Sequence, residues 1–392
     1  MLFQTLVGHS ADLSKLVEYG YDIEIGGGNL LVHHIPFVTS EGKVEFGILV
    51  SELSTTGEST IQPRDHVMWL VGGIPYDHLG QEVGIVINHD PHDFGNGLIA
   101  ACQMSGKKNN QVPTNYYDKV ENYVRILSGF ASVIDPRATY KNAPARESSA
   151  EESVFRYHDS ATSRSGISAV SAKLSMDKVA IVGLGGTGSY ILDLVSKTPV
   201  GEIHLYDGDV FYAHNAFRSP GAATIDELRT SPKKVDYLFS RYDPIRREIY
   251  AHPENVGADN VVQLRAMSFV FIAIDSGPAK KLIVDELVAA HVPFVDCGIF
   301  VFRVENSLGG TLRVTTVTEN HDAHIDRRIS FGDVNDNEYD FNIQTADLNM
   351  MNAAMAVVKW KKFFGYYIDT RHEFNSNYFV NSNRMVSGEM AE

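Results

Sequence analysis

The chain has 392 residues, of which 44% are hydrophobic, and a formal net charge of −15 at pH 7. This composition predicts a globular protein of two domains, and the negative charge disfavours nucleic acids and anionic membranes as partners. No apolar run approaches the roughly 18 residues of a membrane span, and the N-terminus has no secretory pattern, so we expect a cytoplasmic protein without a transmembrane helix.

Residues 1–143 alternate short apolar runs with turn residues, a pattern typical of a smaller α+β domain. The runs predicted as strands are 29–32, 44–50, 66–71 and 83–87. Apolar residues at helical spacing predict one helix over 116–128. The sequence of this domain indicates no chemical activity by itself.

The composition shifts to Ala, Ser, Arg and Glu after this domain, so we expect an interdomain linker and arm over 144–172. A second domain is predicted over 173–392. Between 178 and 297 its apolar runs alternate with helical patterns, which predicts a Rossmann-like, doubly wound α/β fold with a mainly parallel sheet.

Three further segments follow the predicted parallel sheet. Residues 310–317 are predicted to extend it, 319–342 to form a polar surface loop and 348–364 to form a helix. His321 and His324 lie in that loop and are candidate metal ligands, although histidine pairs in polar loops are more often solvated.

A glycine-rich turn is the most informative motif of the second domain. The apolar run 179–182 leads into Gly-Leu-Gly-Gly-Thr-Gly-Ser at 183–189, and a helical pattern follows at 190–195. The first glycine allows a tight turn, the middle glycines let phosphates approach, and the helix N-terminus offers free N–H groups. The candidate nucleotide-binding residues of this turn are Gly183, Gly185, Gly186, Thr187 and Gly188.

Two acidic residues end the next predicted strand, 202–206, in the order Asp207-Gly-Asp209. An acid about 20 residues after the glycines suits ribose hydroxyls. We therefore predict that Asp207 binds the ribose and that Asp209 orients the loop or neighbouring donors. NAD-dependent enzymes share this feature, so it does not identify the nucleotide.

A set of charged and polar residues further along the chain distinguishes a triphosphate nucleotide from a nicotinamide nucleotide. Asn215 and Arg218 precede Lys234, and the apolar strand 269–274 ends at Asp275. Two cations and a strand-end carboxylate suit a triphosphate and a metal ion, whereas a nicotinamide needs no such set. The simpler alternatives are solvated surface cations, a turn asparagine and an N-cap aspartate.

The cysteines limit the covalent chemistry, because only Cys102 and Cys297 occur. Two cysteines cannot form a framework of disulfides, which agrees with a reduced cytoplasm. Cys297 ends an apolar run and is expected to be buried. Cys102 precedes a polar loop, which is compatible with exposure. For both we favour an inert thiol over a nucleophile.

Over roughly residues 155–365 the chain resembles the ThiF/MoeB and ubiquitin-activating superfamily. The resemblance lies in five motifs in this order: Gly-x-Gly-Gly-x-Gly-Ser, Asp-x-Asp, Asn-x-x-Arg, Lys-Val and a strand-end Asp. The resemblance implies an enzyme that adenylates the C-terminal carboxylate of a ubiquitin-like protein with ATP and Mg²⁺. It implies that Asp275 coordinates Mg²⁺ and that Arg218 and Lys234 neutralise phosphate charge, with Lys233 as the alternative lysine. Asn215 would contact the nucleotide or order its loop.

The resemblance also implies a homodimer in which an arginine of the arm reaches the ATP phosphates of the other subunit. Arg164 is our candidate for this arginine, and Arg156 is the alternative. From its size and position, the N-terminal domain is expected to recognise the ubiquitin-like protein or a conjugating partner. The activated carboxylate is expected to pass to a conjugating or sulfur-carrier partner.

The family's usual cysteines have no obvious counterparts, because no cysteine follows Cys297 and the paired Cys-x-x-Cys zinc site is absent from the sequence. We therefore expect the enzyme to stop at the adenylate or to pass it directly to a partner. Three other functions stay open: an NAD(P)-dependent oxidoreductase, a degenerate scaffold, and adenylation of a small molecule or in tRNA modification. The chain has the Arg, Lys and Asp residues of the family motifs, which argues against a non-enzymatic scaffold.

Overall fold

The computed structural model describes residues 3–57, 59–95, 97–107, 112–141, 153–157, 159, 161–162, 165, 167–332 and 343–390. The chain divides into two compact units, each described by itself below. Unit 1 comprises Met1–Glu147 and His158–Ala172, and unit 2 comprises Ser148–Tyr157 and Lys173–Glu392.

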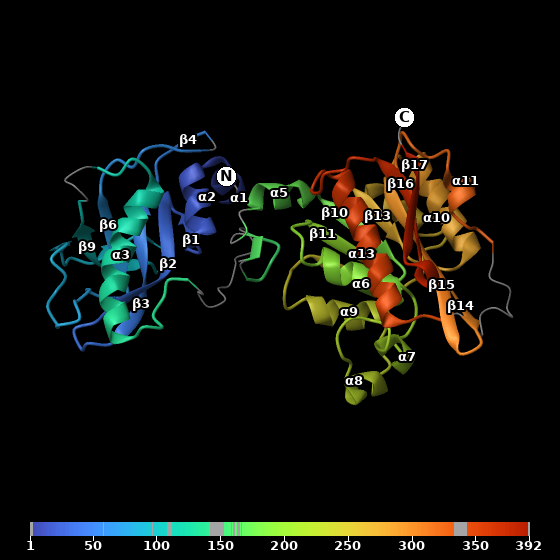
Figure 1. Ribbon diagram of the computed structural model, residues 1–392, viewed down its shortest axis with the longest axis horizontal. Helices are drawn as coiled ribbons and strands as arrows, with labels where there is room; N and C mark the ends of the chain where they lie inside the picture. The colour runs from blue at the N-terminus through green and yellow to red at the C-terminus, as the bar shows by residue number, and fades with distance from the viewer. Residues whose placement is uncertain are drawn as a thin grey trace. The chain divides into compact units, whose positions relative to one another are not determined.

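Unit 1 is built on a seven-stranded antiparallel sheet with the order β1-β2-β3-β6-β9-β7, in which β8 also pairs with β9. The strands of this sheet are β1 Asp22–Gly26, β2 Asn29–Val38, β3 Val44–Glu52, β6 Val67–Val71, β7 Val86–Asn88, β8 His92–Asp93 and β9 Ile99–Ser105. The other elements are α1 Phe3–His9, α2 Ala11–Glu18, β4 Thr55–Thr56, β5 Ser59–Thr60, α3 Tyr116–Ile134 and α5 Ser168–Ser171. Helix α3 packs against β2 and β3 (Figure 1).

The helix predicted over 116–128 is confirmed as α3, which continues to Ile134. Its N-cap is Asn115, whose side chain accepts from the backbone N–H of Asp118 at 2.8 Å. Its buried face includes Val120, Tyr123 and Leu127, as the helical spacing predicts. Among the predicted strands, the run at 83–87 becomes strand only at its end, where β7 begins at Val86.

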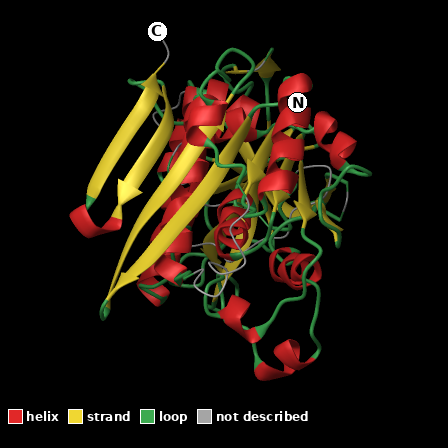
Figure 2. Cartoon of the chain, turned by 90° about the vertical axis from the view of Figure 1, so that its right-hand side faces the viewer, coloured by secondary structure: helices red, strands yellow, loops and turns green. Residues whose placement is uncertain are grey.

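Unit 2 is built on an eight-stranded sheet with the order β12-β11-β10-β13-β14-β15-β16-β17. Its strands are β10 Lys178–Val182, β11 Glu202–Tyr206, β12 Ile249–His252, β13 Phe269–Ile272, β14 Phe294–Val304, β15 Ser307–Val317, β16 Glu373–Phe379 and β17 Arg384–Met390. The first five strands in this order are parallel, and the last three are antiparallel additions. Figure 2 shows long antiparallel strands on the side of the C-terminus.

Helices cover both faces of this sheet. The longer ones are α6 Gly186–Val195, α9 Lys234–Tyr242, α10 Gly277–Ala289 and α13 Ala346–Phe363. The short ones are η2 Ala172–Leu174, α7 Ala213–Ala216, α8 Ile225–Arg229, η3 Val261–Ala266, α11 Ile325–Arg328 and η4 Val380–Ser382. Side chains of α6, α9 and α13 join one buried cluster, and side chains of α10 and η3 join the other.

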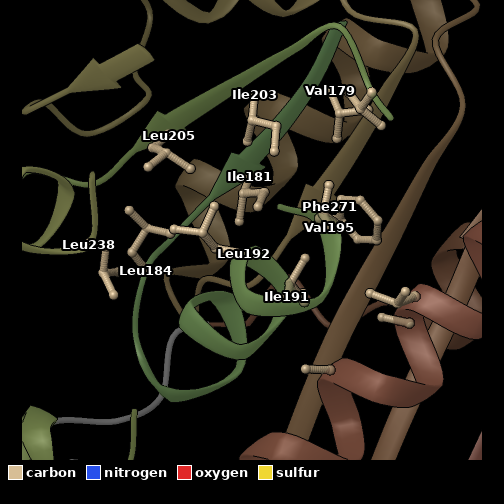
Figure 3. Packing of buried hydrophobic residues seen from close by; sticks show 14 of the residues in the cluster. Val179, Ile181, Leu184, Ile191, Leu192, Val195, Ile203, Leu205, Leu238 and Phe271 are labelled. Atoms are coloured by element: carbon tan, nitrogen blue, oxygen red, sulfur yellow. The ribbon is translucent and has the colours of Figure 1, made fainter. Parts of the chain in front are cut away.

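The two-sided burial follows from the period of a β-strand. Along β10, Val179 and Ile181 belong to the cluster under α6, whereas Ala180 and Val182 belong to the cluster under α10. A strand buried on both faces reads as a continuous apolar run, as residues 179–182 do. Figure 3 shows the first cluster, with these labelled side chains between helix and sheet: Ile181, Leu184, Ile191, Leu192, Val195, Ile203 and Leu205.

The doubly wound α/β fold with a mainly parallel sheet is confirmed. The chain first builds strands on one side, in the order β10-β11-β12, and then returns to add β13 and β14 on the other side of β10. In such sheets ligands bind at this reversal, outside the carboxyl ends of the strands. The site is therefore expected where β10 and β13 end.

The segment after the parallel sheet is more regular than its sequence suggests. The predicted extension at 310–317 is part of the longer β15, whereas β16 and β17 were not predicted. The predicted loop at 319–342 contains α11, and its residues 333–342 lie outside the described part of the chain.

The histidine pair of this loop is only partly solvated, since His321 is half-buried and His324 is buried. His324 is buried, its Nε2 lies 2.9 Å from the carbonyl oxygen of Thr316, and His321 stacks on Phe374. No group of three or more His, Cys, Asp or Glu side chains suited to a metal ion occurs among the described residues. No helix in the described part of the chain is long and apolar enough to span a membrane.

Part of the segment predicted as a linker is attached to unit 2. Phe155 forms a β-bridge with Arg246, and the backbone N–H of Arg247 donates to Val154 O at 2.7 Å. Arg156, the alternative arm arginine, forms an ion pair with Asp243 at 2.5 Å. Arg156 is thus engaged in holding this segment in place, and Arg164 lies outside the described residues.

Candidate nucleotide-binding site

The glycine turn depends on glycine at two positions for steric reasons. Gly183 has a φ of +87°, and a Cβ there would lie 2.5 Å from the carbonyl oxygen of Ala273. A Cβ on Gly188 would lie 1.8 Å from the carbonyl oxygen of Gly183. The first turn of α6 is therefore packed directly against the end of β10.

Two neighbouring positions of the turn differ in what surrounds them. A Cβ on Gly185, the N-cap residue of α6, would meet nothing within 4 Å. A Cβ on Gly186 would lie 2.2 Å from the side chain of Asn349. Asn349, at the start of α13, also accepts from Thr187 Oγ1 at 3.0 Å. One side of the turn is thus sealed by α13, and the side at Gly185 is open to a ligand.

This difference predicts opposite results for two glycine substitutions. Gly188→Ala should lower the free energy of unfolding by about 3 kcal/mol or more, because the new Cβ meets backbone. Gly185→Ala should leave stability nearly unchanged but weaken ATP binding roughly tenfold or more, because its Cβ would occupy the open side of the turn. Chemical unfolding and ATP titration measure the two effects. Unchanged ATP affinity in Gly185→Ala would place phosphates elsewhere.

Asp207 is buried and organises two backbone segments. Its Oδ2 accepts from the backbone N–H of Leu184 at 2.7 Å, and its Oδ1 accepts from the backbone N–H of Asp209 at 2.9 Å. The carboxylate therefore ties the end of β11 to the glycine turn. Its proposed contact with a ribose stays a prediction.

Lys234 bridges the two acids of the Asp-x-Asp motif. It is the first residue of α9, it is buried, and its Nζ lies 2.7 Å from Asp209 Oδ2 and 3.3 Å from Asp207 Oδ2. The adjacent Lys233 donates to the backbone carbonyl of Gly208 instead. Of the two candidate lysines, Lys234 is the one that places its charge among the acids beside the glycine turn.

Asn215 shapes the loop that presents Arg218. The buried Asn215 side chain accepts from the backbone N–H of Tyr212 at 2.9 Å. The backbone carbonyl of Asn215 accepts from the backbone N–H of Arg218 at 3.0 Å. These bonds satisfy the loop backbone internally. In this structure Asn215 orders its loop, which is one of the two roles predicted for it.

Arg218 has an unusual environment for an arginine. Its side chain is half-buried, and its buried Nε has no hydrogen-bond partner among the residues that the structure describes. Burial lowers the pKa of the guanidinium, and the opposite charge of Asp275 partly offsets this effect. A buried donor without an acceptor costs free energy, so its retention indicates a missing acceptor such as an anionic ligand.

Asp275 follows β13 at the reversal of strand order. It is exposed, and the N-cap residue of α10 is Ser276. Asp275 is therefore not an N-cap aspartate, which was the simpler alternative for this residue. Arg218 lies close enough for its charge to interact with that of Asp275. The Asp275 carboxylate therefore lies at the edge of the sheet where ligands bind in this fold, and its charge acts on the half-buried guanidinium of Arg218.

A buried polar network lies one strand further along and was missed by sequence reasoning. Asp296 of β14 is fully buried, and its carboxylate lies 2.5 Å from Arg313 Nη2 and 3.3 Å from Lys280 Nζ. Lys280 belongs to α10, the helix that follows Asp275. The signal in the sequence was an aspartate inside an apolar run, which requires a buried partner.

Apart from Asn215, which orders the loop that carries Arg218, the predicted site residues fall into three groups. The glycine turn, Asp207, Asp209 and Lys234 form one connected cluster. Arg218 and Asp275 interact with each other at the end of β13. Arg164 lies outside the described residues, and its role stays a prediction. The open side of Gly185, the unpaired Arg218 Nε and the exposed carboxylate suit a nucleotide and a divalent cation.

Neither thiol is accessible. Cys297 is buried in β14, and burial raises its pKa strongly. Cys102, which the sequence left compatible with exposure, is fully buried in β9, and burial raises its pKa to about 12. It faces the core of unit 1 because it alternates with the outward residues of its strand. A thiolate is the reactive form of cysteine, so both thiols are poorly suited to nucleophilic chemistry.

Two family models match the chain. The ThiF family matches residues 162–383, and a domain of unknown function (DUF6791) matches residues 11–160. No curated protein sequence matches significantly.

Several solved structures are similar in fold. Escherichia coli MccB with MccA-N7isoASN is 17% identical, with 58% of this chain and 68% of that chain covered and a TM-score of 0.45. Escherichia coli MccB with ATP is 17% identical over 58% and 68% of the two chains, with a TM-score of 0.42. PaaA is 16% identical over 57% and 67%, with a TM-score of 0.42.

Proposed function

The chain belongs to the ThiF family, and from this premise we propose that it adenylates the C-terminal carboxylate of a ubiquitin-like protein. Family membership supports ATP-dependent adenylation of a substrate carboxylate. The ubiquitin-like identity of the substrate is the finer part of the proposal.

The proposed reaction needs no general base, because a carboxylate is ionised at pH 7. One carboxylate oxygen attacks the α-phosphorus of ATP. A bond forms from this oxygen to phosphorus, the bond from phosphorus to the bridging oxygen breaks, and pyrophosphate leaves with that electron pair. The chain's own residues supply positioning and charge, which is how most of the barrier is lowered in such reactions.

The observation that carries this proposal is the Arg218 guanidinium. Its Nε is buried without an acceptor in the described parts of the chain, and the charge of the exposed Asp275, which follows β13, acts on the guanidinium. Phosphate oxygens are acceptors for a guanidinium and also ligands for a cation held by a carboxylate. Asp275 would hold Mg²⁺, which supplies charge neutralisation at the phosphates, while Gly185 leaves room for their approach.

The direct test is ATP–pyrophosphate exchange with synthetic tails. Flexible peptides that end in a free glycine carboxylate should support exchange in the presence of Mg²⁺, and the same peptides with a C-terminal amide should not. Exchange with small carboxylic acids alone would favour the small-molecule alternative. Reduction of NAD(P) without pyrophosphate release would contradict the proposal and favour an oxidoreductase.

The proposal includes a homodimer with Arg164 acting across the interface. Mixing Arg164→Ala chains with Asp275→Asn chains should then restore roughly a quarter of the wild-type exchange rate. Half of randomly mixed dimers are heterodimers, and each heterodimer holds one intact site. Sedimentation should show the dimer. A monomer with full activity would rule out this part of the proposal.

The buried thiols predict that adenylation needs no cysteine of this chain. The double variant Cys102→Ala/Cys297→Ala should retain pyrophosphate exchange within about twofold, because neither thiol is accessible. Each substitution should cost about 1 kcal/mol of stability, so folding is checked first by circular dichroism. The prediction fails if the protein substrate forms a reductant-sensitive adduct that either substitution abolishes.

A further inference from the structure

The buried network of Asp296, Lys280 and Arg313 lies beside the candidate nucleotide site. Val182, Ile272 and Asp296 occupy one row across β10, β13 and β14, because Val182 pairs with Ile272 and Ile272 pairs with Asp296. Neighbouring strands are roughly 4.8 Å apart, so Asp296 lies about 10 Å across the sheet from the residue that precedes the glycine turn.

Arg313 lies beyond the end of the parallel sheet, beside the segment that leads to Asp275. It pairs with Gly298, which follows Asp296 by two residues on β14. β14 runs parallel to β13, which ends three residues before Asp275, so Gly298 lies at the level of this segment. Asp296 contacts both Arg313 and Lys280, which places Arg313 on the face of the sheet covered by α10, the helix that follows Asp275.

The network carries one positive charge in excess. Among the residues that the structure describes, Asp296 is the one acid that forms an ion pair with Lys280 or Arg313. Its Oδ2 accepts from Arg313 Nη2, whereas Lys280 Nζ lies 3.3 Å from Oδ1 as an ion pair without hydrogen-bond geometry. Two cations therefore share one fully buried carboxylate. Since an unmatched charge is costly to desolvate, this arrangement favours an anionic ligand at the cation that solvent reaches.

The guanidinium of Arg313 is held in place but is not closed off from solvent. Its Nη1 donates to Thr315 Oγ1 at 2.8 Å, and its Nη2 lies 2.5 Å from Asp296 Oδ2. A Cβ on Gly298 would lie 2.8 Å from Nη2 and 3.1 Å from Nε, so a glycine is needed for the guanidinium to lie against the strand. The Arg313 side chain is still 18% exposed. A fixed guanidinium with an exposed part is suited to binding a carboxylate.

The other cations of the site lie toward the opposite end of the sheet. Lys234 contacts the acids after β11 and the glycine turn follows β10, whereas Arg313 belongs to β15, beyond β13 and β14. In phosphoryl transfer the attacking and leaving oxygens lie roughly in line. An attacking carboxylate therefore needs its binding group on a different side of the phosphorus from the groups that hold the pyrophosphate.

We propose that Arg313 binds the carboxylate of the substrate tail before adenylation. Asp296, Lys280 and Gly298 are positioning residues, because they hold the Arg313 guanidinium and do not contact the substrate. The proposal rests on the proposed function for the identity of the substrate. It adds a substrate-binding residue outside the five sequence motifs, on the antiparallel extension of the sheet.

The test measures binding of a fluorescently labelled, flexible peptide that ends in Gly-Gly to the full-length protein without ATP. Anisotropy titrations compare the free carboxylate with the C-terminal amide of the same peptide. The wild type should bind the carboxylate roughly tenfold more tightly, because the amide forms no charge-assisted hydrogen bond with a guanidinium. Arg313→Gln should abolish this preference and leave the affinity for the amide unchanged, whereas a structural defect would weaken both.

Gly298→Ala tests the positioning role, because it keeps every charge of the network. Its Cβ would displace the end of the flexible Arg313 side chain, so the protein should fold and the carboxylate preference should fall roughly fivefold. The matched control is Arg303→Gln, which removes an exposed arginine of β14 and should bind both peptides like the wild type. Circular dichroism checks the folding of all three variants, and their affinity for ATP with Mg²⁺ should stay within about twofold of the wild type.

Equal wild-type affinity for the two peptides, or an unchanged carboxylate preference in Arg313→Gln, would overturn the proposal. Weakened ATP binding in Arg313→Gln with the peptide preference intact would also overturn it, because the guanidinium would then bind a phosphate. If Arg313→Gln does not fold, a wild-type preference in Gly298→Ala decides against it. A carboxylate preference that depends on Arg313, together with absent pyrophosphate exchange, would contradict the adenylation reaction alone.

Discussion

Asp275→Asn is expected to lower ATP–pyrophosphate exchange by roughly 10²-fold or more while the protein stays folded. Asp275 is exposed at the end of β13, so the substitution removes a charge from a surface position rather than from a core. The neutral amide would hold a divalent cation poorly, because Mg²⁺ prefers carboxylate oxygens. Exchange assays across a range of Mg²⁺ concentrations measure the effect.

The matched control for Asp275→Asn is Asp285→Asn. Asp285 lies in α10, the helix that follows Asp275, and it is exposed and forms an ion pair with the surface residue Lys281. The Asp285→Asn variant should catalyse ATP–pyrophosphate exchange at the wild-type rate. If Asp275→Asn also keeps the wild-type rate and Mg²⁺ dependence, Asp275 does not hold the metal.

Arg218→Gln is expected to reduce exchange by about 10²- to 10³-fold, the range found for removal of one positioned donor. It should not lower the melting temperature, because within the described part of the chain the buried Nε of Arg218 has no hydrogen-bond partner to lose. This combination separates a ligand-binding arginine from a structural one. A structural arginine, such as the fully buried Arg246 with its bonds to the carbonyls of Val200 and Gly201, should instead lower stability when replaced.

Arg218→Lys tests whether charge alone suffices. Lysine keeps the positive charge but loses the planar fork, so it should recover only part of the activity lost in Arg218→Gln. Arg229→Gln is the control, because Arg229 is exposed and pairs with Asp226 at the surface. If Arg218→Gln loses stability in proportion to activity, the guanidinium has a structural role and the proposed phosphate contact is wrong.

The sequence by itself determined the layers of unit 2 and the position of its glycine turn. Runs such as 179–182 are apolar at every residue, which requires a strand buried on both faces, and the structure places helices on both sides of β10. Gly183 and Gly188 are likewise dictated locally, since Gly183 has a φ of +87° and a Cβ on Gly188 would meet the carbonyl oxygen of Gly183. Periodicity and turn chemistry act between near neighbours, so they are readable from the sequence.

Only the tertiary structure decided which polar groups meet. Thr187 bonds Asn349 across 162 residues, and Asp296 lies between Arg313 and Lys280 from different elements. The burial of Cys102 and His324 and the attachment of Arg156 to Asp243 also differ from what their neighbours in sequence suggested. A residue's neighbours along the chain specify its strand or helix, but its partners depend on how those elements pack. The burial of Arg218 Nε without a hydrogen-bond partner among the described residues also arises from such packing.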